Sequence, residues 1–218
     1  MKTALIFGSS GLVGGHLLTK LIQNNNYSKI KVFIRSELEI NDSKLDIIKT
    51  DFNNLENHRE EIKGDDCFFC IGTTKKNSPD KNEYRRVELD IPKEIAQIAK
   101  SNSVNSFAFV SSGYADAKSS GDYLKFKGLV EEELKNLNFS KLAIMRPSFL
   151  IGDRKEERVG EKIGIFLFKM LSPLFLGPLK KMKPIQSETV ARAMIRATNE
   201  NLEKNIFESN EIVELVLN

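Results

Sequence analysis

A tyrosine and a lysine four residues apart, Tyr123 and Lys127, lie in a stretch with helical periodicity, so they share one face of the expected helix. A phenol can give or take a proton at a substrate oxygen, and a neighbouring ammonium favours its ionised form. The pair Ser111-Ser112, which follows an expected strand just upstream, offers a hydroxyl to hold that oxygen. The pattern predicts hydride chemistry at a carbonyl or alcohol. The alternative is a packed tyrosine beside an exposed lysine.

Three glycines near the N-terminus predict a phosphate-binding loop. Gly8, Gly11 and Gly14 fall between an expected strand at residues 3–7 and an expected helix at residues 12–22. Glycine permits the tight turn and close backbone approach, and the helix N-terminus offers free N–H groups to a pyrophosphate. The alternative is that the glycines only shape a turn. The expected dinucleotide contacts are Gly8, Ser10, Gly11, Leu12, Val13 and Gly14.

The residue type at the end of the second expected strand favours NADP(H) over NAD(H). A carboxylate about 20 residues past the loop would bind the ribose of NAD, but Arg35 stands there, and a guanidinium pairs with a 2′-phosphate. NAD(H) remains the alternative, with Arg35 as a solvated charge and Glu37 at the ribose. Asp51 and Phe52, after the third expected strand, suit an adenine contact, although a turn-forming aspartate is the competing interpretation.

Strands and helices alternate along the chain, and the strands are continuously apolar, which is typical of a parallel sheet covered on both faces. We therefore predict an α/β fold of the Rossmann type, a doubly wound parallel sheet in a single domain (residues 1–218). A small C-terminal helical cover over the substrate is expected at about residues 153–185. The expected strands are residues 3–7, 30–34, 45–49, 67–71, 106–110 and 141–145, and the expected helices are residues 12–22, 79–101 and 121–137.

Composition narrows the function classes. Hydrophobic residues make up 40% and charged residues 29% of the 218 residues, which excludes a disordered chain, and a net charge of +3 gives no case for nucleic acid. Residues 163–179 are apolar but short and interrupted by Lys169, Pro173 and Pro178, so no stable membrane insertion is expected. We expect no signal peptide at the N-terminus and a cytoplasmic location.

Neither a redox pair nor a metal site is expected. Two cysteines are too few for a disulfide scaffold and suit a reducing compartment. Cys67 and Cys70 form a C-x-x-C pattern inside an expected strand, where residues three apart face opposite sides of the sheet. We therefore interpret them as buried thiols. His16 and His58 have no companion ligands.

These motifs together resemble the short-chain dehydrogenase/reductase superfamily in its extended or atypical branch, and more closely its Tat-interacting oxidoreductase-like group. The resemblance covers nearly the whole chain. It rests on residues 70–74, on residues 123–128 with Glu131 after them, and on residues 146–150 leading into Asp153. It implies a Rossmann fold that binds NADP(H), with Ser112, Tyr123 and Lys127 as catalytic residues and Ser111 as the less favoured candidate for the hydroxyl. Beside the nicotinamide and its ribose it implies Gly72, Thr73, Ser111, Tyr123, Lys127, Pro147, Ser148, Phe149 and Leu150.

The chain departs from the superfamily in two ways. Many members have a relay asparagine where this chain has Glu88. The chain also ends near residue 218, so a bulky sugar-nucleotide substrate is less expected than a small carbonyl or alcohol. The runner-up function is an NADP(H)-sensing regulatory protein with little turnover. By analogy with the superfamily, a homodimer through residues 79–101 and 121–137 is expected.

Overall fold

A parallel sheet organises the fold, and the computed structural model describes residues 1–152 and 183–217. Seven strands pair in parallel in the order β3-β2-β1-β4-β5-β6-β9. The chain order reverses between β1 and β4, the place where a doubly wound sheet binds its ligands. The α/β Rossmann-type prediction is confirmed. The strands are β1 Lys2–Phe7, β2 Tyr27–Ile34, β3 Leu45–Lys49, β4 Asp66–Phe69, β5 Ser106–Val110, β6 Lys141–Arg146 and β9 Ile206–Glu208.

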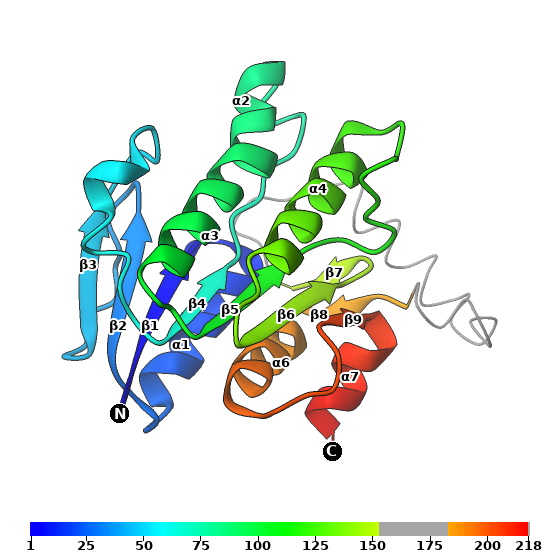
Figure 1. Cartoon of the computed structure of the whole chain (residues 1–218). Coiled ribbons are helices and arrows are strands. Elements are labelled where there is room, and N and C mark those ends of the chain that lie inside the picture. The colour runs from blue at the N-terminus through cyan, green and yellow to red at the C-terminus, as the bar shows by residue number, and fades with distance from the viewer. Residues whose placement is uncertain (153–182, 218) are drawn as a thin grey trace.

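Helices cover both faces of the sheet (Figure 1). Helices α1 and α6 lie behind it, whereas α3 and α4 lie in front. A separate short pair of parallel strands, β7 and β8, joins the segment after β6 to the segment before α6. The helices are α1 Leu12–Gln23, α2 Lys81–Arg85, α3 Ile91–Ser101, α4 Asp122–Asn136, α6 Ser187–Asn199 and α7 Ser209–Leu217. The short strands are β7 Leu150–Ile151 and β8 Ile185–Gln186, and a 3-10 turn spans Leu55–His58.

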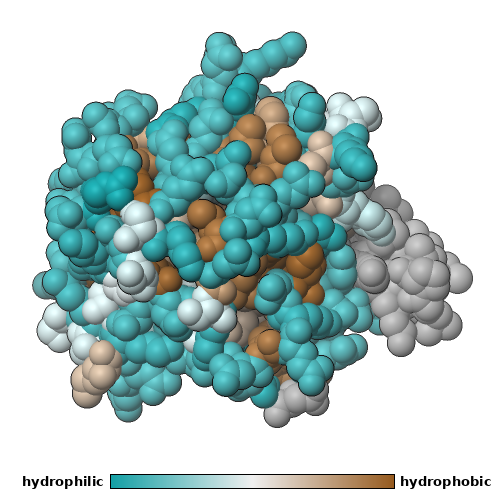
Figure 2. All heavy atoms as spheres, in the orientation of Figure 1, coloured by the Kyte–Doolittle hydropathy of each residue, from teal (hydrophilic) through white to brown (hydrophobic). Residues whose placement is uncertain are grey.

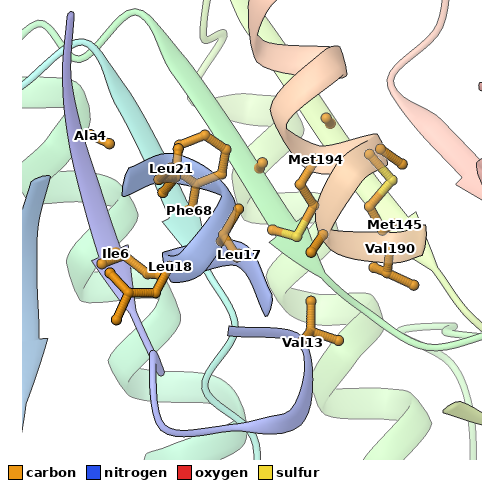
Figure 3. Close-up of a cluster of buried hydrophobic side chains, with 14 of the residues drawn as sticks. Ala4, Ile6, Val13, Leu17, Leu18, Leu21, Phe68, Met145, Val190 and Met194 are labelled. Atoms are coloured by element: carbon orange, nitrogen blue, oxygen red, sulfur yellow. The ribbon is translucent and has the colours of Figure 1, made fainter. Parts of the chain in front are cut away.

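Two apolar clusters, one on each face of the sheet, form the core. Behind the sheet, Leu17 of α1 and Met194 of α6 lie against sheet side chains such as Phe68 (Figure 3). On the front face, the rings of Phe7 and Phe33 stack with centroids 4.4 Å apart. Strands that are buried on both faces must be apolar throughout, so their sequences are continuous runs of apolar residues rather than alternating apolar and polar residues.

The expected helix at residues 79–101 is interrupted, and the interruption moves one side chain into the site. Between α2 and α3 the chain makes a π-helical turn, Arg86–Asp90, closed by a hydrogen bond from the N–H of Ile91 to the carbonyl of Arg86. Pro92 has no N–H, and its ring excludes a regular turn against the carbonyl of Glu88 four residues earlier. The wider turn leaves the Glu88 side chain buried.

Other differences lie at element ends and near the C-terminus. The strand expected at residues 67–71 is Asp66–Phe69, so Cys70 lies beyond its end. The short strand β9 and helix α7 were not expected, because three- and nine-residue elements show little periodicity. Most of the proposed substrate cover at residues 153–185, and all of the apolar stretch 163–179, lie outside the described residues. None of the described helices is long and apolar enough to cross a membrane.

The homodimer expected from the sequence would form through α3 and α4, which lie on the front face of the sheet. Glu133 of α4 pairs with Lys93 of α3 at 3.2 Å and accepts a hydrogen bond from Gln97 at 2.7 Å, so polar contacts link the two helices. On this face, hydrophilic atoms divide the hydrophobic surface into small patches (Figure 2). The homodimer stays a prediction.

Candidate active site

The glycine-rich loop between β1 and α1 is closed so tightly that two positions require glycine. Gly8 has φ +90°, and its carbonyl accepts a 3.0 Å hydrogen bond from the N–H of Gly11. A Cβ at Gly14 would lie 2.0 Å from that same carbonyl oxygen. Helix α1 begins with no side-chain cap and no acidic residue in its first turn, so its N–H groups remain available to an anion.

The side chains around this loop fit a pyrophosphate cradle. Ser9 is buried, and its Oγ has no hydrogen-bond partner within the described part of the chain. Ser10 is exposed beside it, whereas Val13 packs into the core and contributes its backbone to the loop. The Leu12 side chain packs against Gly152, where an added Cβ would lie 2.6 Å from its Cδ1. The residues present therefore fit the nucleotide that the sequence predicts.

Arg35 and Asp51 occupy the expected strand ends but differ in what surrounds them. Arg35 is exposed directly after β2, and Lys49 lies 3.2 Å from Glu37, the alternative ribose ligand. The Asp51 carboxylate accepts 2.9 Å hydrogen bonds from the backbone N–H and the side-chain amide of Asn53. The backbone hydrogen bond from Asn53 is the main cause of a lowered pKa at Asp51. The Asp51 carboxylate thus closes a local turn with Asn53, and its contact with adenine stays a prediction.

Phe52, expected beside Asp51 at the adenine, turns its ring into the core. The residue has φ +63° and lies 6.5 Å from the ring of Phe7, measured between centroids. Its carbonyl oxygen accepts a 2.6 Å hydrogen bond from Arg86. The Phe52 side chain therefore anchors this loop on the sheet.

Lys127 is the most constrained of the predicted catalytic residues. Its side chain is 4% exposed, with Nζ 3.0 Å from Glu88 Oε2. Nζ also donates to the carbonyl of Val110 at 3.3 Å and lies 5.9 Å from the centre of the Tyr123 ring. Burial lowers the pKa of Lys127, but the charges of Glu88 and Tyr123 outweigh burial, so the pKa rises above its ordinary value. Lys127 therefore stays an ammonium near neutral pH.

The two serines at the end of β5 differ in their contacts. Ser111 is buried, and its hydroxyl donates to Glu131 Oε1 at 2.5 Å. Ser112 is half-buried and makes only a 3.3 Å hydrogen bond to the carbonyl of Gly113. Tyr123 is 38% exposed at the start of α4. Ser112 is thus the more accessible of the two hydroxyls, and its catalytic role stays a prediction.

Two loops complete the edge of the sheet. The N–H of Thr73 donates to Glu88 Oε1 at 2.5 Å, which brings the Gly72–Thr73 loop against the partner of Lys127. Pro147 accepts a 2.9 Å hydrogen bond from the N–H of Gly113. The Ser148 hydroxyl contacts the carbonyl of Lys183, Phe149 is exposed, and Leu150 enters β7. The structure therefore places residues 72–73, 111–112, 123–127 and 147–150 at the same edge.

Sequence reasoning missed a buried ion pair beneath this edge. Glu131 lies one helical turn beyond Lys127 on α4 and is 1% exposed. Its carboxylate accepts from Nε of Arg146 at 2.9 Å and from the second guanidinium nitrogen at 2.5 Å. Arg146 also donates to the carbonyl of Ala115 at 3.1 Å. The four-residue spacing of Tyr123, Lys127 and Glu131 is the signal that could have revealed the pair.

The two thiols pack on opposite faces of the sheet, as expected from their spacing. Cys67 is buried in the front cluster, whereas Cys70 is a partly buried residue that packs against the rear cluster. Burial raises the pKa of both thiols, that of Cys70 to about 12. Within residues 1–152 and 183–217, no three His, Cys, Asp or Glu side chains are grouped to hold a metal ion.

Comparisons with known proteins agree with this geometry. A family model described as NAD(P)H-binding matches residues 8–201. Protein HTATIP2 of Rattus norvegicus is 33% identical over 164 residues, covering 73% of this chain and 67% of the relative. Protein FMP52 of Candida glabrata, named mitochondrial, is 28% identical over 226 residues, covering 100% of this chain and 97% of the relative.

Solved structures show the same fold at low sequence identity. The enzyme WbmH of Bordetella bronchiseptica in complex with NAD⁺ has a TM-score of 0.72 at 16% identity, covering 95% of this chain and 75% of that one. A UDP-glucose 4-epimerase of Thermotoga maritima has a TM-score of 0.71 at 15% identity, covering 98% of this chain and 81% of that one.

The comparisons correct one expectation and establish the family. Several fungal relatives are named as mitochondrial proteins, which contradicts the cytoplasmic location expected from the sequence. The family match across most of the chain shows that a nicotinamide nucleotide is the cofactor class. The chain belongs to the NAD(P)H-binding family, as an atypical short-chain dehydrogenase/reductase of the group that contains HTATIP2 and FMP52.

Proposed function

We propose that this protein is an NADP(H)-dependent oxidoreductase that reduces a small carbonyl or oxidises the corresponding alcohol. The observation that supports it best is the placement of Lys127, an ammonium held 5.9 Å from the Tyr123 ring centre at the strand edge where Ser112 lies. A buried cation beside a phenol favours the phenolate, which is the form that removes a proton from an alcohol.

Each of these side chains has a distinct task in the proposed reaction. In reduction, Tyr123 donates its hydroxyl proton to the substrate oxygen, and in oxidation its phenolate accepts that proton. The Ser112 hydroxyl donates a hydrogen bond to the same oxygen and fixes its position. Lys127 stabilises the phenolate between turnovers. The nicotinamide, when bound, supplies or accepts the hydride.

The preference for NADP(H) rests on Arg35. An exposed guanidinium at the end of β2 can pair bidentately with a 2′-phosphate, whereas a carboxylate there would repel it. Glu37, which would bind a ribose hydroxyl in an NAD enzyme, lies beside Lys49. Both features favour the phosphorylated cofactor.

The experiment is a turnover screen with a tyrosine variant. Purified protein is given NADPH with aldehydes, ketones and quinones, and loss of nicotinamide absorbance is recorded. With a substrate found, Tyr123→Phe should lower kcat by about 100-fold or more, because proton transfer contributes a factor of that order, while the Kd for NADPH stays nearly unchanged. Tyr114→Phe is the matched control, because Tyr114 is 60% exposed in a loop. An equal loss of kcat in both variants, or no loss of kcat in Tyr123→Phe, contradicts the proposal.

A second candidate function is an NADP(H) sensor with little turnover. The Glu88–Lys127 ion pair favours it, since a paired lysine acts less strongly on a phenol than a free one. A sensor would bind NADPH without oxidising it against any compound in the screen. On binding NADPH, a sensor would also show slower hydrogen–deuterium exchange in segments away from the strand edge, such as α7. An enzyme requires slower exchange only near the bound nucleotide.

A further inference from the structure

Glu88 links two parts of the site that are far apart in the sequence. One oxygen of its carboxylate, Oε1, accepts the N–H of Thr73 at 2.5 Å, and the other lies 3.0 Å from Nζ of Lys127. The residue is 1% exposed. A Cβ at Gly72 would lie 3.5 Å from Oε1 and 4.0 Å from Nζ, so the loop, the carboxylate and the ammonium are in contact.

Local backbone structure holds this carboxylate in place. Glu88 is the central residue of the π-helical turn Arg86–Asp90, and the turn is required because Pro92 follows four residues later. The Glu88 side chain is buried and paired with Lys127 of α4. The contact therefore belongs to the fold and is not a chance surface pair.

Titratable groups of three further segments lie around the ion pair of Glu88 and Lys127. Lys127 faces Glu88 from α4, and the ring centre of Tyr123 lies 5.9 Å from Nζ of Lys127. Tyr84 of α2 also lies near Glu88, and burial and then the charge of Glu88 raise the pKa of Tyr84. Cys70, after β4, adds a protonated thiol near Lys127. Glu88 and Lys127 form a buried ion pair, so their opposite charges offset each other. Asp122, at the start of α4, also contributes to the raised pKa of Tyr84.

We propose that Glu88 is a positioning residue that sets the protonation of Tyr123 by neutralising Lys127, and that it holds Lys127 against the Gly72–Thr73 loop. This inference rests on the proposed function, because it assigns the acid–base role to Tyr123. A carboxylate next to the ammonium weakens the field that the ammonium exerts on the phenol. The phenolate then forms at higher pH than it would beside a bare lysine.

The first test needs no turnover. Protein labelled at lysine Cε and Nζ is titrated by NMR without cofactor, and the Lys127 signal is assigned by its loss in Lys127→Arg. The wild-type pKa of Lys127 should exceed the ordinary lysine value, and in Glu88→Gln it should fall by about one unit or more, since burial is no longer offset. Glu133→Gln, which removes a more exposed carboxylate of α4, is the matched control and should leave the pKa of Lys127 unchanged.

The second test is the pH profile of alcohol oxidation. Glu88→Gln should shift the alkaline rise of kcat to lower pH by about one unit, whereas Glu88→Asp, which keeps the charge, should retain the wild-type midpoint with a lower kcat. A purely structural role would lower kcat in both variants without moving the midpoint.

Three results would overturn the inference. One is an unshifted Lys127 titration in Glu88→Gln, and another is an unshifted pH midpoint. The third is a wild-type Lys127 pKa below that of an ordinary lysine, which would overturn the inference even if Glu88→Gln does not fold. If no substrate is turned over by the wild type, the proposed function fails, whereas the titration still tests the coupling of Glu88 and Lys127.

Discussion

The hydroxyl of Ser111 donates a 2.5 Å hydrogen bond to Glu131, whose carboxylate also holds the guanidinium of Arg146. This contact ties the end of β5 to the middle of α4 and so fixes where the next residue, Ser112, presents its hydroxyl. We propose different roles for the two adjacent serines, in which Ser111 stabilises the site and Ser112 contacts the substrate.

Substitution of each serine should separate these roles. Ser111→Ala should lower the free energy of unfolding by about 1.5–3 kcal/mol, the usual contribution of a hydrogen bond to a charged group, and urea titration measures this. Ser112→Ala should leave that free energy nearly unchanged but lower kcat by about 100-fold, as loss of an oxyanion donor does. A large kcat loss in Ser111→Ala at full stability would reverse the assignment.

Neighbouring glycines at the start of α1 provide a second matched pair. In Gly14→Ala the new methyl group would lie 2.0 Å from the carbonyl of Gly8, so the loop must open. We expect about 1–3 kcal/mol of destabilisation from the overpacking and at least about a tenfold weaker Kd for NADPH, since the N–H groups lose their alignment.

Gly15→Ala is the control for the loop. Its methyl group would lie 3.6 Å from the carbonyl of Ser9, an ordinary contact, and alanine gains up to about 1 kcal/mol over glycine in a helix. Calorimetry of NADPH binding and thermal unfolding of both variants test the contrast. Similar losses of affinity in the two variants would show that the close approach of Gly14 to Gly8 has no role.

The sequence predicted the sheet well because its signal is local. Each buried parallel strand is a short apolar run, and the strand at residues 106–110 coincides with β5, Ser106–Val110. The glycine loop was also readable, because its backbone constraints fall within seven residues. The position of Ser112 at a strand end followed from the same local pattern.

Contacts between distant segments were not readable in the same way. Glu88 was recognised as standing in the place of an asparagine, but its contact with Lys127 depends on a π-helical turn that shifts the helix register. The contact of Glu131 with Arg146 joins a helix to a strand end, and neither residue alone marks it. The packing of the Phe52 ring near Phe7 was not readable either, whereas the adenine contact expected at Asp51 and Phe52 stays a prediction.

Cofactor preference gives a third prediction. Arg35→Ala should weaken NADPH binding by about 10- to 100-fold, the equivalent of one charge-assisted contact, and should leave NADH binding nearly unchanged. Glu37→Gln, which changes a neighbouring exposed charge, should alter neither affinity by more than about twofold. Calorimetric Kd values for both nucleotides check this. Equal affinities in the wild type would exclude the 2′-phosphate contact.

The two cysteines give the last prediction, which concerns reactivity and pH. Because burial raises the pKa of Cys70 to about 12 and that of Cys67 well above its usual range, both remain thiols in the native protein near pH 8. Ellman's reagent should therefore label neither within minutes at that pH and both after guanidinium unfolding, because the thiolate is the reactive form.

The same raised pKa values predict a loss of stability in alkali. The folded chain holds the thiol protons more tightly than the unfolded chain does, so this contribution is complete below the unfolded pKa and is lost as pH rises from about 9 toward about 12. The double variant Cys67→Ala/Cys70→Ala should lose less stability between pH 8 and pH 10, in about the range where unfolded thiols ionise. Chemical denaturation at both pH values measures the difference, and fast native labelling of Cys70 would mean that its thiol is not held in this environment.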